Sequence, residues 1–245
     1  MTEREQDLME RVLGEGCRAM NLTLSQRQKD QFQTYYELLI RTNKVMNLTA
    51  ITDYEDVLVK HFLDSICLAK FIDLNNISTM IDIGTGAGFP GLPLKIMFPH
   101  IRTVLADALM KRVGFLNEVI DACSITEIEA VHARAEDLSA NPDYREKFDL
   151  CVSRAVASLP VLAEYDMPFV RVGGMFAAYK SSDIEEEFEK SEGALKILGG
   201  VPKDPVLYNI PGTDIPRSMV ITLKTENTPG RYPRKPGIIQ KKPLQ

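Results

Sequence analysis

The sequence lacks several features that would point to a membrane, a disulfide framework or a metal. It has no apolar run of about 18 residues, so we expect no transmembrane helix. Its three histidines are dispersed and its four cysteines show no CxxC spacing, so neither disulfides nor a zinc site is expected. The charged N-terminus contains no apolar segment of the kind found in signal peptides. Together these absences predict a cytoplasmic protein without a metal and without a membrane partner.

Acidic side chains are missing from one stretch, the C-terminal tail. The whole chain carries a net charge of −5, which argues against a surface that binds nucleic acid everywhere. From Asn227 onward there is no acidic residue, whereas five residues are basic: Arg231, Arg234, Lys235, Lys241 and Lys242. A basic tail on an acidic body can contact phosphates. The alternatives are a solvated terminus and a tail that packs across a sheet edge.

The periodicity of apolar residues changes along the chain. Segments 25–47 and 52–72 have helical spacing, with Ser25 and Asp53 as expected N-caps. From residue 79 onward, short β-rich runs alternate with helical runs. The expected strands are 79–84, 102–107, 127–133, 148–154 and 174–180, and the expected helices are 109–123, 158–172 and 183–200.

This alternation predicts βαβ units and a mainly parallel sheet with helices on both faces. Segments 204–211 and 217–225 are expected to form a terminal hairpin, whereas 228–245 is too rich in proline and glycine for regular structure. We expect three parts: an N-terminal helical extension at 1–77, a Rossmann-like domain at 78–226 and a basic tail at 227–245. The N-terminal helices could be a cap on the sheet or an RNA platform.

Three glycines follow the first expected strand of the sheet. The spacing Gly86-x-Gly88-x-x-Gly91 matches the dinucleotide fingerprint, and Asp107 lies about 20 residues further on, at the end of the next strand. Glycine at such a turn lets the main chain approach a ligand closely. NAD and S-adenosylmethionine both contain adenosine, so an acid that accepts from ribose hydroxyls suits either cofactor.

Asp82 helps to separate these two cofactors. It lies at the end of the first strand, two residues before Gly84. A carboxylate is poorly placed beside a pyrophosphate but suits a sulfonium and an ammonium group. This favours S-adenosylmethionine, with a dinucleotide or a glycine turn without a ligand as the alternatives.

Further candidates follow the third and fourth strands. Ala135 and Glu136 are expected beside the adenine ring, although Glu136 could also be an acid favoured by a helix N-terminus. Arg154 is expected in the cleft, although it could instead be a surface arginine paired with a neighbouring acid.

Several short motifs resemble those of one family. They are "NLTAI" (47–51), "HFLDSI" (61–66), "DIGTGAGFPGLPL" (82–94), "DALMKRVGFL" (107–116), "RAEDL" (134–138), "SRAVASL" (153–159) and "YPRKPG" (232–237). On these motifs the chain resembles, over nearly its whole length, the bacterial small-subunit ribosomal RNA guanine-N(7) methyltransferases, also called glucose-inhibited division protein B.

The resemblance implies a doubly wound α/β fold of the class I S-adenosylmethionine-dependent methyltransferase type, with a seven-stranded sheet. It also implies S-adenosylmethionine as the donor and a guanine of 16S ribosomal RNA as the acceptor. The cofactor-contacting positions carried over by motif are Gly84, Phe89, Ala135, Glu136 and Arg154. The arguments above add Asp82, Gly86, Gly88 and Asp107. Phe89 could instead be a packing side chain under the turn.

Basic side chains near the cleft and in the tail are the expected RNA contacts. They are Lys111, Arg112, Arg134, Arg217, Arg231, Arg234 and Lys235. For Lys111 and Arg112, solvated helix charges are the alternative. We expect a monomer that acts on 16S RNA, free or in a small-subunit particle.

No catalytic acid or base is expected, because N(7) of neutral guanine carries a free lone pair and no proton. In keeping with this, the sequence shows no Ser-His-Asp constellation and no Asn/Asp-Pro-Pro-aromatic motif. Two other functions remain open at this point: a methyltransferase for a small molecule or protein, and a dinucleotide-binding regulator without catalytic activity.

Overall fold

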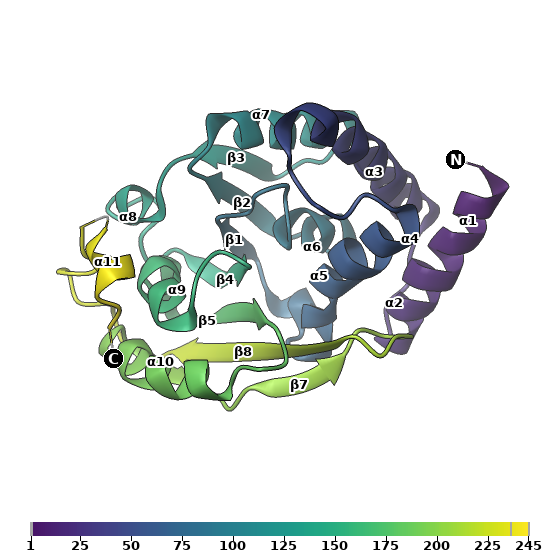
Figure 1. Cartoon of the computed structure of the whole chain (residues 1–245). Coiled ribbons are helices and arrows are strands. Elements are labelled where there is room, and N and C mark those ends of the chain that lie inside the picture. Colours follow the sequence, from purple (N-terminus) through teal and green to yellow (C-terminus); the bar gives the residue numbers. More distant parts are fainter. Residues whose placement is uncertain (1, 236, 245) are drawn as a thin grey trace.

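A single eight-stranded sheet runs through the centre of the computed structural model, which describes residues 2–235 and 237–244 (Figure 1). The strands are β1 (Thr79–Ile83), β2 (Arg102–Asp107), β3 (Ile128–His132), β4 (Phe148–Arg154), β5 (Val170–Lys180), β6 (Gly200–Pro202), β7 (Val206–Asn209) and β8 (Pro216–Lys224). Their order is β3-β2-β1-β4-β5-β8-β6, with β7 also paired to β8. Strands β1 to β5 are parallel and β8 is antiparallel, so the predicted mainly parallel sheet is confirmed.

The sheet has one strand more than the seven predicted. Both β6 and β7 pair with β8, β6 opposite residues 222–224 and β7 opposite residues 216–219. Because they pair with different stretches of β8, they occupy one position at the sheet edge, as an interrupted strand. The register of pairing with β8 differs by one residue between β6 and β7. The predicted hairpin of β7 and β8 is confirmed. Strand β6 was not predicted, because a three-residue strand containing Gly200 and Pro202 has little strand propensity; the helix expected over 183–200 ends before it, at Ile197.

Helices lie on both faces of the sheet (Figure 1). The helices of the described residues are α1 (Glu3–Met9), α2 (Glu15–Ala19), α3 (Gln26–Met46), α4 (Tyr54–Val57), α5 (Asp64–Ile66), α6 (Gly91–Met97), α7 (Met110–Ala122), α8 (Ala135–Leu138), α9 (Leu159–Asp166), α10 (Glu185–Ile197) and α11 (Ile238–Lys241). π-Helical segments join α1 to α2 (Glu10–Gly14) and α4 to α5 (Leu58–Leu63), and single 3-10 turns lie at Cys67–Lys70, Leu74–Asn76 and Met167–Phe169. Of the helices in the described residues, none is long and apolar enough to cross a membrane.

Both predicted N-caps are confirmed. The Ser25 hydroxyl accepts from the Gln28 amide at 3.3 Å, and the Asp53 carboxylate accepts from the Asp56 amide at 3.1 Å. Two other predictions were wrong. The helix expected over 158–172 ends at Asp166, where a 3-10 turn containing Pro168 leads into β5, and proline does not continue a helix. The tail, expected to be irregular, contains the short helix α11.

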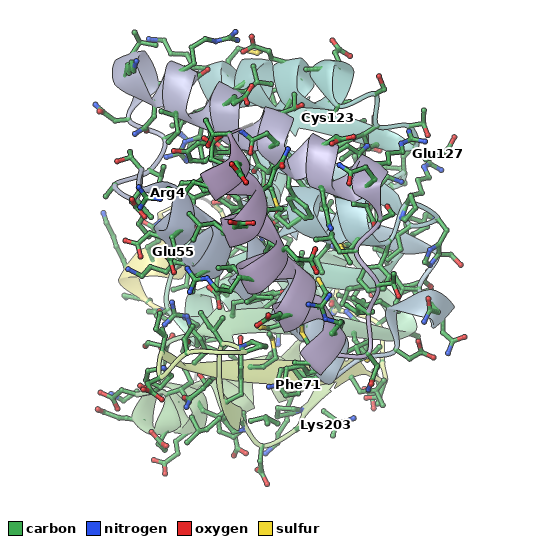
Figure 2. The ribbon with its side chains drawn as sticks, turned by 90° about the vertical axis from the view of Figure 1, so that its right-hand side faces the viewer. Arg4, Glu55, Phe71, Cys123, Glu127 and Lys203 are labelled. Atoms are coloured by element: carbon green, nitrogen blue, oxygen red, sulfur yellow. The ribbon has the colours of Figure 1, made fainter. Side chains whose placement is uncertain are left out.

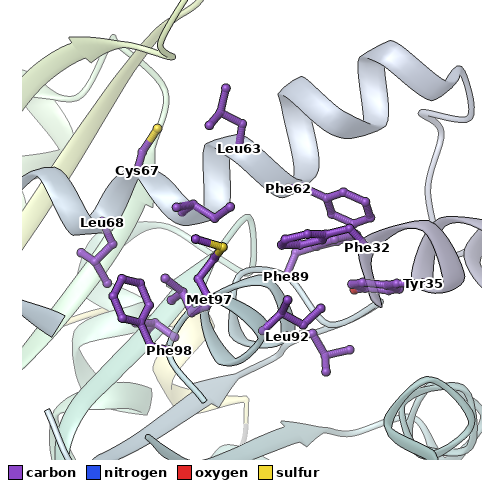
Figure 3. Close-up of a cluster of buried hydrophobic side chains, with 14 of the residues drawn as sticks. Phe32, Tyr35, Phe62, Leu63, Cys67, Leu68, Phe89, Leu92, Met97 and Phe98 are labelled. Carbon is purple, nitrogen blue, oxygen red and sulfur yellow. The ribbon is translucent and has the colours of Figure 1, made fainter. Parts of the chain in front are cut away.

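Alternate residues of each strand face opposite layers of the core. Met80, Leu105 and Val152 pack under α3, α5, α6 and α7, whereas Ile81 and Cys151 pack under α9 and α10. The first layer continues into the N-terminal helices, which lie across one side of the molecule (Figure 2). Figure 3 shows this continuity, with aromatic rings from α3 and from the α4–α5 segment beside the loop that follows β1.

All four cysteines are buried within these layers and none is in a disulfide. Burial raises the pKa of the thiols of Cys17 and Cys67 to about 12 and that of Cys123 to about 11. The Cys151 thiol, on the central strand β4, has a pKa well above its usual value for the same reason. These thiols therefore behave as apolar core groups.

Candidate functional site

A cavity of about 610 Å³ lies at the carboxyl ends of β1, β4 and β5. The strand order reverses between β1 and β4, because the chain runs outward from β1 to β3 and then returns to β4. Open α/β sheets bind ligands at this kind of switch point. Six of the predicted site residues line the cavity: Gly84, Gly86, Phe89, Arg112, Arg154 and Arg217.

The glycine loop after β1 forms one wall of the cavity. Gly84, Gly86 and Gly88 have φ values of +69°, +62° and +102°, a region that side chains rarely adopt. A Cβ at Gly88 would lie 2.5 Å from Leu92, whereas a Cβ at Gly86 would meet nothing closer than 3.9 Å. Gly88 is therefore required by packing, and Gly86 leaves open space for a ligand.

Asp82 lies beneath this loop instead of in the cavity wall. Its Oδ2 accepts from the Gly91 amide and the Thr85 hydroxyl, both at 2.7 Å, and the residue is fully buried. Burial raises the pKa of Asp82 to about 7 and outweighs the opposing effect of these two donors. We predicted a cofactor contact, but the geometry gives Asp82 the task of holding the loop, so any influence on a ligand is electrostatic.

Asp107, at the end of β2, also holds the loop. Its Oδ2 accepts from the Gly86 amide at 2.9 Å, and its Oδ1 accepts from the Leu109 amide at 2.9 Å. Arg112 Nη1 lies 3.3 Å from the same Oδ2. Arg112, predicted to contact RNA, is thus paired at the cavity edge. Contact between Asp107 and ribose hydroxyls stays a prediction.

Phe89 is packed from several sides. Its ring stacks on His61 with centroids 4.4 Å apart and on Tyr35 at 5.5 Å, and the Arg154 guanidinium lies 5.2 Å from its centroid. With 7% of its surface exposed, Phe89 offers little free ring to a base. The packing role, given above as the alternative, agrees with this geometry, although the ring still lines the cavity.

His61 is a cavity residue that sequence reasoning missed. Its Nε2 lies 2.8 Å from the Thr49 hydroxyl, which fixes the ring beside Phe89. Burial, reinforced by the positive charge of Arg154, lowers the pKa of His61 to about 4. The imidazole is therefore neutral at physiological pH. The only signal for it was its place in the "HFLDSI" motif.

Asp64, also from that motif, joins two arginines inside the cavity. Its Oδ2 accepts from Arg154 Nη1 at 3.0 Å, and its Oδ1 lies 3.3 Å from Arg217 Nε. Asp64 is 3% exposed and comes from α5, whereas its partners come from the end of β4 and the start of β8. The alternative given for Arg154 is half confirmed: it does pair with an acid, Asp64, but it is not a surface residue, because its side chain is mostly buried and lines the cavity.

Other predicted residues do not line the cavity. Ala135 and Glu136 begin α8, beyond β3, and Ala135 packs against Val161, Tyr165 and Ile239. Lys111 and Arg134 are exposed, on α7 and before α8. Their roles beside adenine or RNA stay predictions.

The tail packs against α9 instead of lying free. Arg234 forms a two-pronged ion pair with Glu164, with Nη2 2.6 Å from Oε2 and Nε 2.9 Å from Oε1. Its backbone amide also donates to Glu164 at 2.7 Å, and Glu164 is fully buried. The Arg234 guanidinium therefore attaches the tail to α9, and its predicted contact with RNA phosphates stays a prediction. Arg231 and Lys235 are exposed.

Sequence comparison places this geometry in a known family. The family model for rRNA small subunit methyltransferase G matches residues 28–208. The chain belongs to this family. A relative named Ribosomal RNA small subunit methyltransferase G from Acetivibrio thermocellus is 48% identical over 244 residues and covers 100% of both chains. Another of that name, from Exiguobacterium sibiricum, is 47% identical and covers 91% of this chain and 94% of its own.

Solved structures resemble the fold at much lower identity. A predicted O-methyltransferase from Agrobacterium tumefaciens has a TM-score of 0.52 and 16% identity, covering 67% of this chain and 80% of that chain. A mutant of the protein MtNAS in complex with S-adenosylmethionine has a TM-score of 0.53 and 12% identity, covering 80% and 72%. At this identity the likeness concerns the fold alone.

Within residues 2–235 and 237–244, no group of three or more His, Cys, Asp or Glu side chains is placed to hold a metal.

Proposed function

We propose that this protein transfers a methyl group from S-adenosylmethionine to N(7) of a guanine in 16S ribosomal RNA. The observation that carries the proposal is the family match, which spans the glycine loop and the cavity-lining motifs. We further propose that the protein acts as a cytoplasmic monomer on RNA that is free or part of a small-subunit particle.

The cavity suits S-adenosylmethionine. Its wall is a glycine loop with open space at Gly86, and the carboxylates of Asp82 and Asp107 lie directly behind this loop. Negative charge behind the wall favours a cationic ligand. The backbone of Gly84 and Gly86 and the guanidinium of Arg154 would hold the cofactor, which supplies an activated methyl group. Contacts of Ala135 and Glu136 with its adenine are part of the proposal.

The residues around the cavity do not need to move a proton. N(7) of guanine has a free lone pair, so the protein must align the base and exclude water. Neutral His61 and the Phe89 ring stacked on it form an uncharged part of the cavity wall. Arg154 is held by Asp64, so its charge is balanced near the position where the base becomes cationic.

The direct test is methylation of 16S RNA by the purified protein with labelled S-adenosylmethionine, followed by mapping of N(7)-methylguanine. Calorimetric titration with S-adenosylmethionine and with NAD should give binding of the first only. Transfer of label to a small molecule or protein but not to RNA would refute the proposed substrate.

A further inference from the structure

One buried carboxylate oxygen in the cavity lacks a hydrogen-bond donor. Asp64 is 3% exposed, and its Oδ2 accepts from Arg154 at 3.0 Å. Its Oδ1 is 3.3 Å from Arg217 Nε, an ion pair without hydrogen-bond geometry, and within the described part of the chain it has no hydrogen-bond partner. A buried acceptor without a donor is costly, so such atoms call for a functional explanation.

The surroundings of Asp64 fix its position. It follows a π-helical segment, a distortion often found at functional sites, and its neighbours Leu63 and Ile66 are fully buried. Arg217 projects from β8, with a quarter of its side chain exposed. Asp64 and Arg217 both line the cavity, so an acceptor lies beside donors. The Asp64 Oδ1 itself is covered, and a ligand reaches it when the partly exposed Arg217 side chain moves aside.

Guanine carries the complementary pair of groups. Its O6 is an acceptor and the adjacent N1–H is a donor, whereas adenine has a donor at N6 and an acceptor at N1. We infer that Asp64 and Arg217 read the target guanine, with Oδ1 of Asp64 accepting from N1–H and Arg217 donating to O6. This inference rests on the proposed function. It makes the pair specificity-determining, because enzymes that act on an extruded base commonly read its Watson–Crick edge.

The same contact would favour the reaction itself. When N(7) gains a methyl group, the base becomes cationic and N1–H becomes a stronger donor. The hydrogen bond to Asp64 therefore strengthens as charge develops, and contacts that strengthen in the transition state raise the rate. No proton needs to leave N1 in this step. An adenine would place its N1 lone pair against the carboxylate and its amino group against Arg217.

The test uses 16S RNA in which the methylated position, once mapped, carries guanosine, inosine or adenosine. Inosine keeps O6 and N1–H but lacks the 2-amino group. For the wild-type protein we expect single-turnover methylation of inosine within a few-fold of guanosine, and adenosine slower by about 100-fold or more. Inosine reacting as poorly as adenosine would overturn the inference.

The decisive comparison is between wild type and Asp64→Ala. The variant should lose roughly 10- to 100-fold in kcat/KM on guanosine and inosine RNA and much less on adenosine RNA. Comparing the same RNAs across variants cancels the intrinsic difference in reactivity between the bases. An equal loss on all three would mean that Asp64 only supports the structure, which would contradict the inference.

Glu164→Gln is a matched control, because it weakens another buried carboxylate–arginine pair that does not line the cavity. It should lower stability while keeping the guanosine-to-adenosine ratio. If Asp64→Ala does not fold, Arg217→Ala, on the more exposed partner, gives the same comparison. Absence of methylation by the wild-type protein would refute the proposed function, whereas methylation with an unchanged ratio in the variants would refute this inference alone.

Discussion

Two titratable residues near the cavity, His61 and Asp82, have pKa values shifted by burial. Burial lowers the pKa of His61 to about 4, so this imidazole is neutral throughout the physiological range. Burial raises the pKa of Asp82 to about 7, with Arg154 opposing and Asp107 reinforcing the rise. Asp82 is therefore the group near the glycine loop whose charge changes with pH in that range.

We predict that affinity for S-adenosylmethionine rises with pH. A cation binds the ionised carboxylate better, so binding favours proton release from Asp82. With a free-protein pKa of about 7, the dissociation constant should fall by up to about tenfold between about pH 6 and pH 8. Calorimetry should show this trend in the wild type and a flat profile in Asp82→Asn. The same slope in both proteins would assign the effect to another group.

The methylation step itself should depend little on pH. With cofactor and RNA saturating, the single-turnover rate should be nearly flat from about pH 6.5 to pH 8.5, because N(7) stays unprotonated. Rapid-quench measurement of methyl transfer gives this rate directly. A steep rise with one apparent pKa in that range would show that a protein base takes part.

A second residue prediction concerns Asp107. Its carboxylate holds Gly86 and Leu109, and we expect it also to accept from ribose hydroxyls. Asp107→Ala should weaken cofactor binding by about 1.5–3 kcal/mol, and Asp107→Asn, which keeps one acceptor oxygen, by less. Titration calorimetry measures the change and circular dichroism checks the fold. Unchanged affinity in a folded Asp107→Ala protein would exclude this role.

Among the structural elements, the basic tail combines residues that attach it to the domain with exposed residues that are free to contact RNA. Arg234 is attached to Glu164 on α9, whereas Lys235 and Lys241 are exposed. Tyr232 and Ile239 are buried, so the tail is fixed to the domain at several points. Attachment and RNA contact can therefore be separated by substitution.

Arg234→Ala should lower the free energy of unfolding by about 2–3 kcal/mol, less than for a fully buried pair, since a quarter of the arginine is exposed.

The double variant of Lys235→Ala and Lys241→Ala should keep the melting temperature. It should reduce the slope of log RNA affinity against log salt by about one unit for each lost phosphate contact. Thermal denaturation and RNA titration at several salt concentrations test both expectations. If Arg234→Ala instead reduced the slope of log RNA affinity against log salt and left the free energy of unfolding unchanged, Arg234 would be an RNA contact and not an attachment of the tail.

The sequence was enough to predict the strands β1 to β4, the caps Ser25 and Asp53, and the location of the cavity at the glycine loop. These features depend on local patterns. The ion pair of Arg234 with Glu164 joins residues 70 positions apart, and Asp64 meets Arg154 across 90 positions. No local pattern states which partners will meet. Asp82 differs, because its partners Thr85 and Gly91 are near it in sequence. We expected it to contact the cofactor, but its carboxylate is fully buried and accepts from these two residues behind the loop.

At the scale of the whole molecule, one hydrophobic layer joins the N-terminal helices to the sheet. Leu13, Phe32 and Phe62 belong to the same buried cluster as Met80 of β1 and Phe89 of the glycine loop. Figure 3 shows Phe32 and Phe62 beside Phe89. The division at residue 77 stays a prediction. Because the N-terminal helices and the sheet share one hydrophobic core, neither segment keeps a core of its own when the other unfolds.

We therefore predict a single cooperative unfolding transition. Denaturant melts followed by circular dichroism and by tyrosine fluorescence should coincide, as they do for two-state proteins. Removal of residues 1–24 should prevent folding, because it uncovers buried side chains of α3 and of the α4–α5 segment. Two separated transitions would show that the N-terminal helices are an independent unit.

The four buried thiols have a practical consequence. Because a thiolate is the reactive form, each cysteine can be alkylated only when its surroundings open. They lie in α2, after α5, at the end of α7 and on the central strand β4. The chain thus contains four cysteines whose alkylation reports local opening of the core, three in the layer shared with the N-terminal helices and one in the layer under α9 and α10. Mass spectrometry can follow this alkylation without any engineered label.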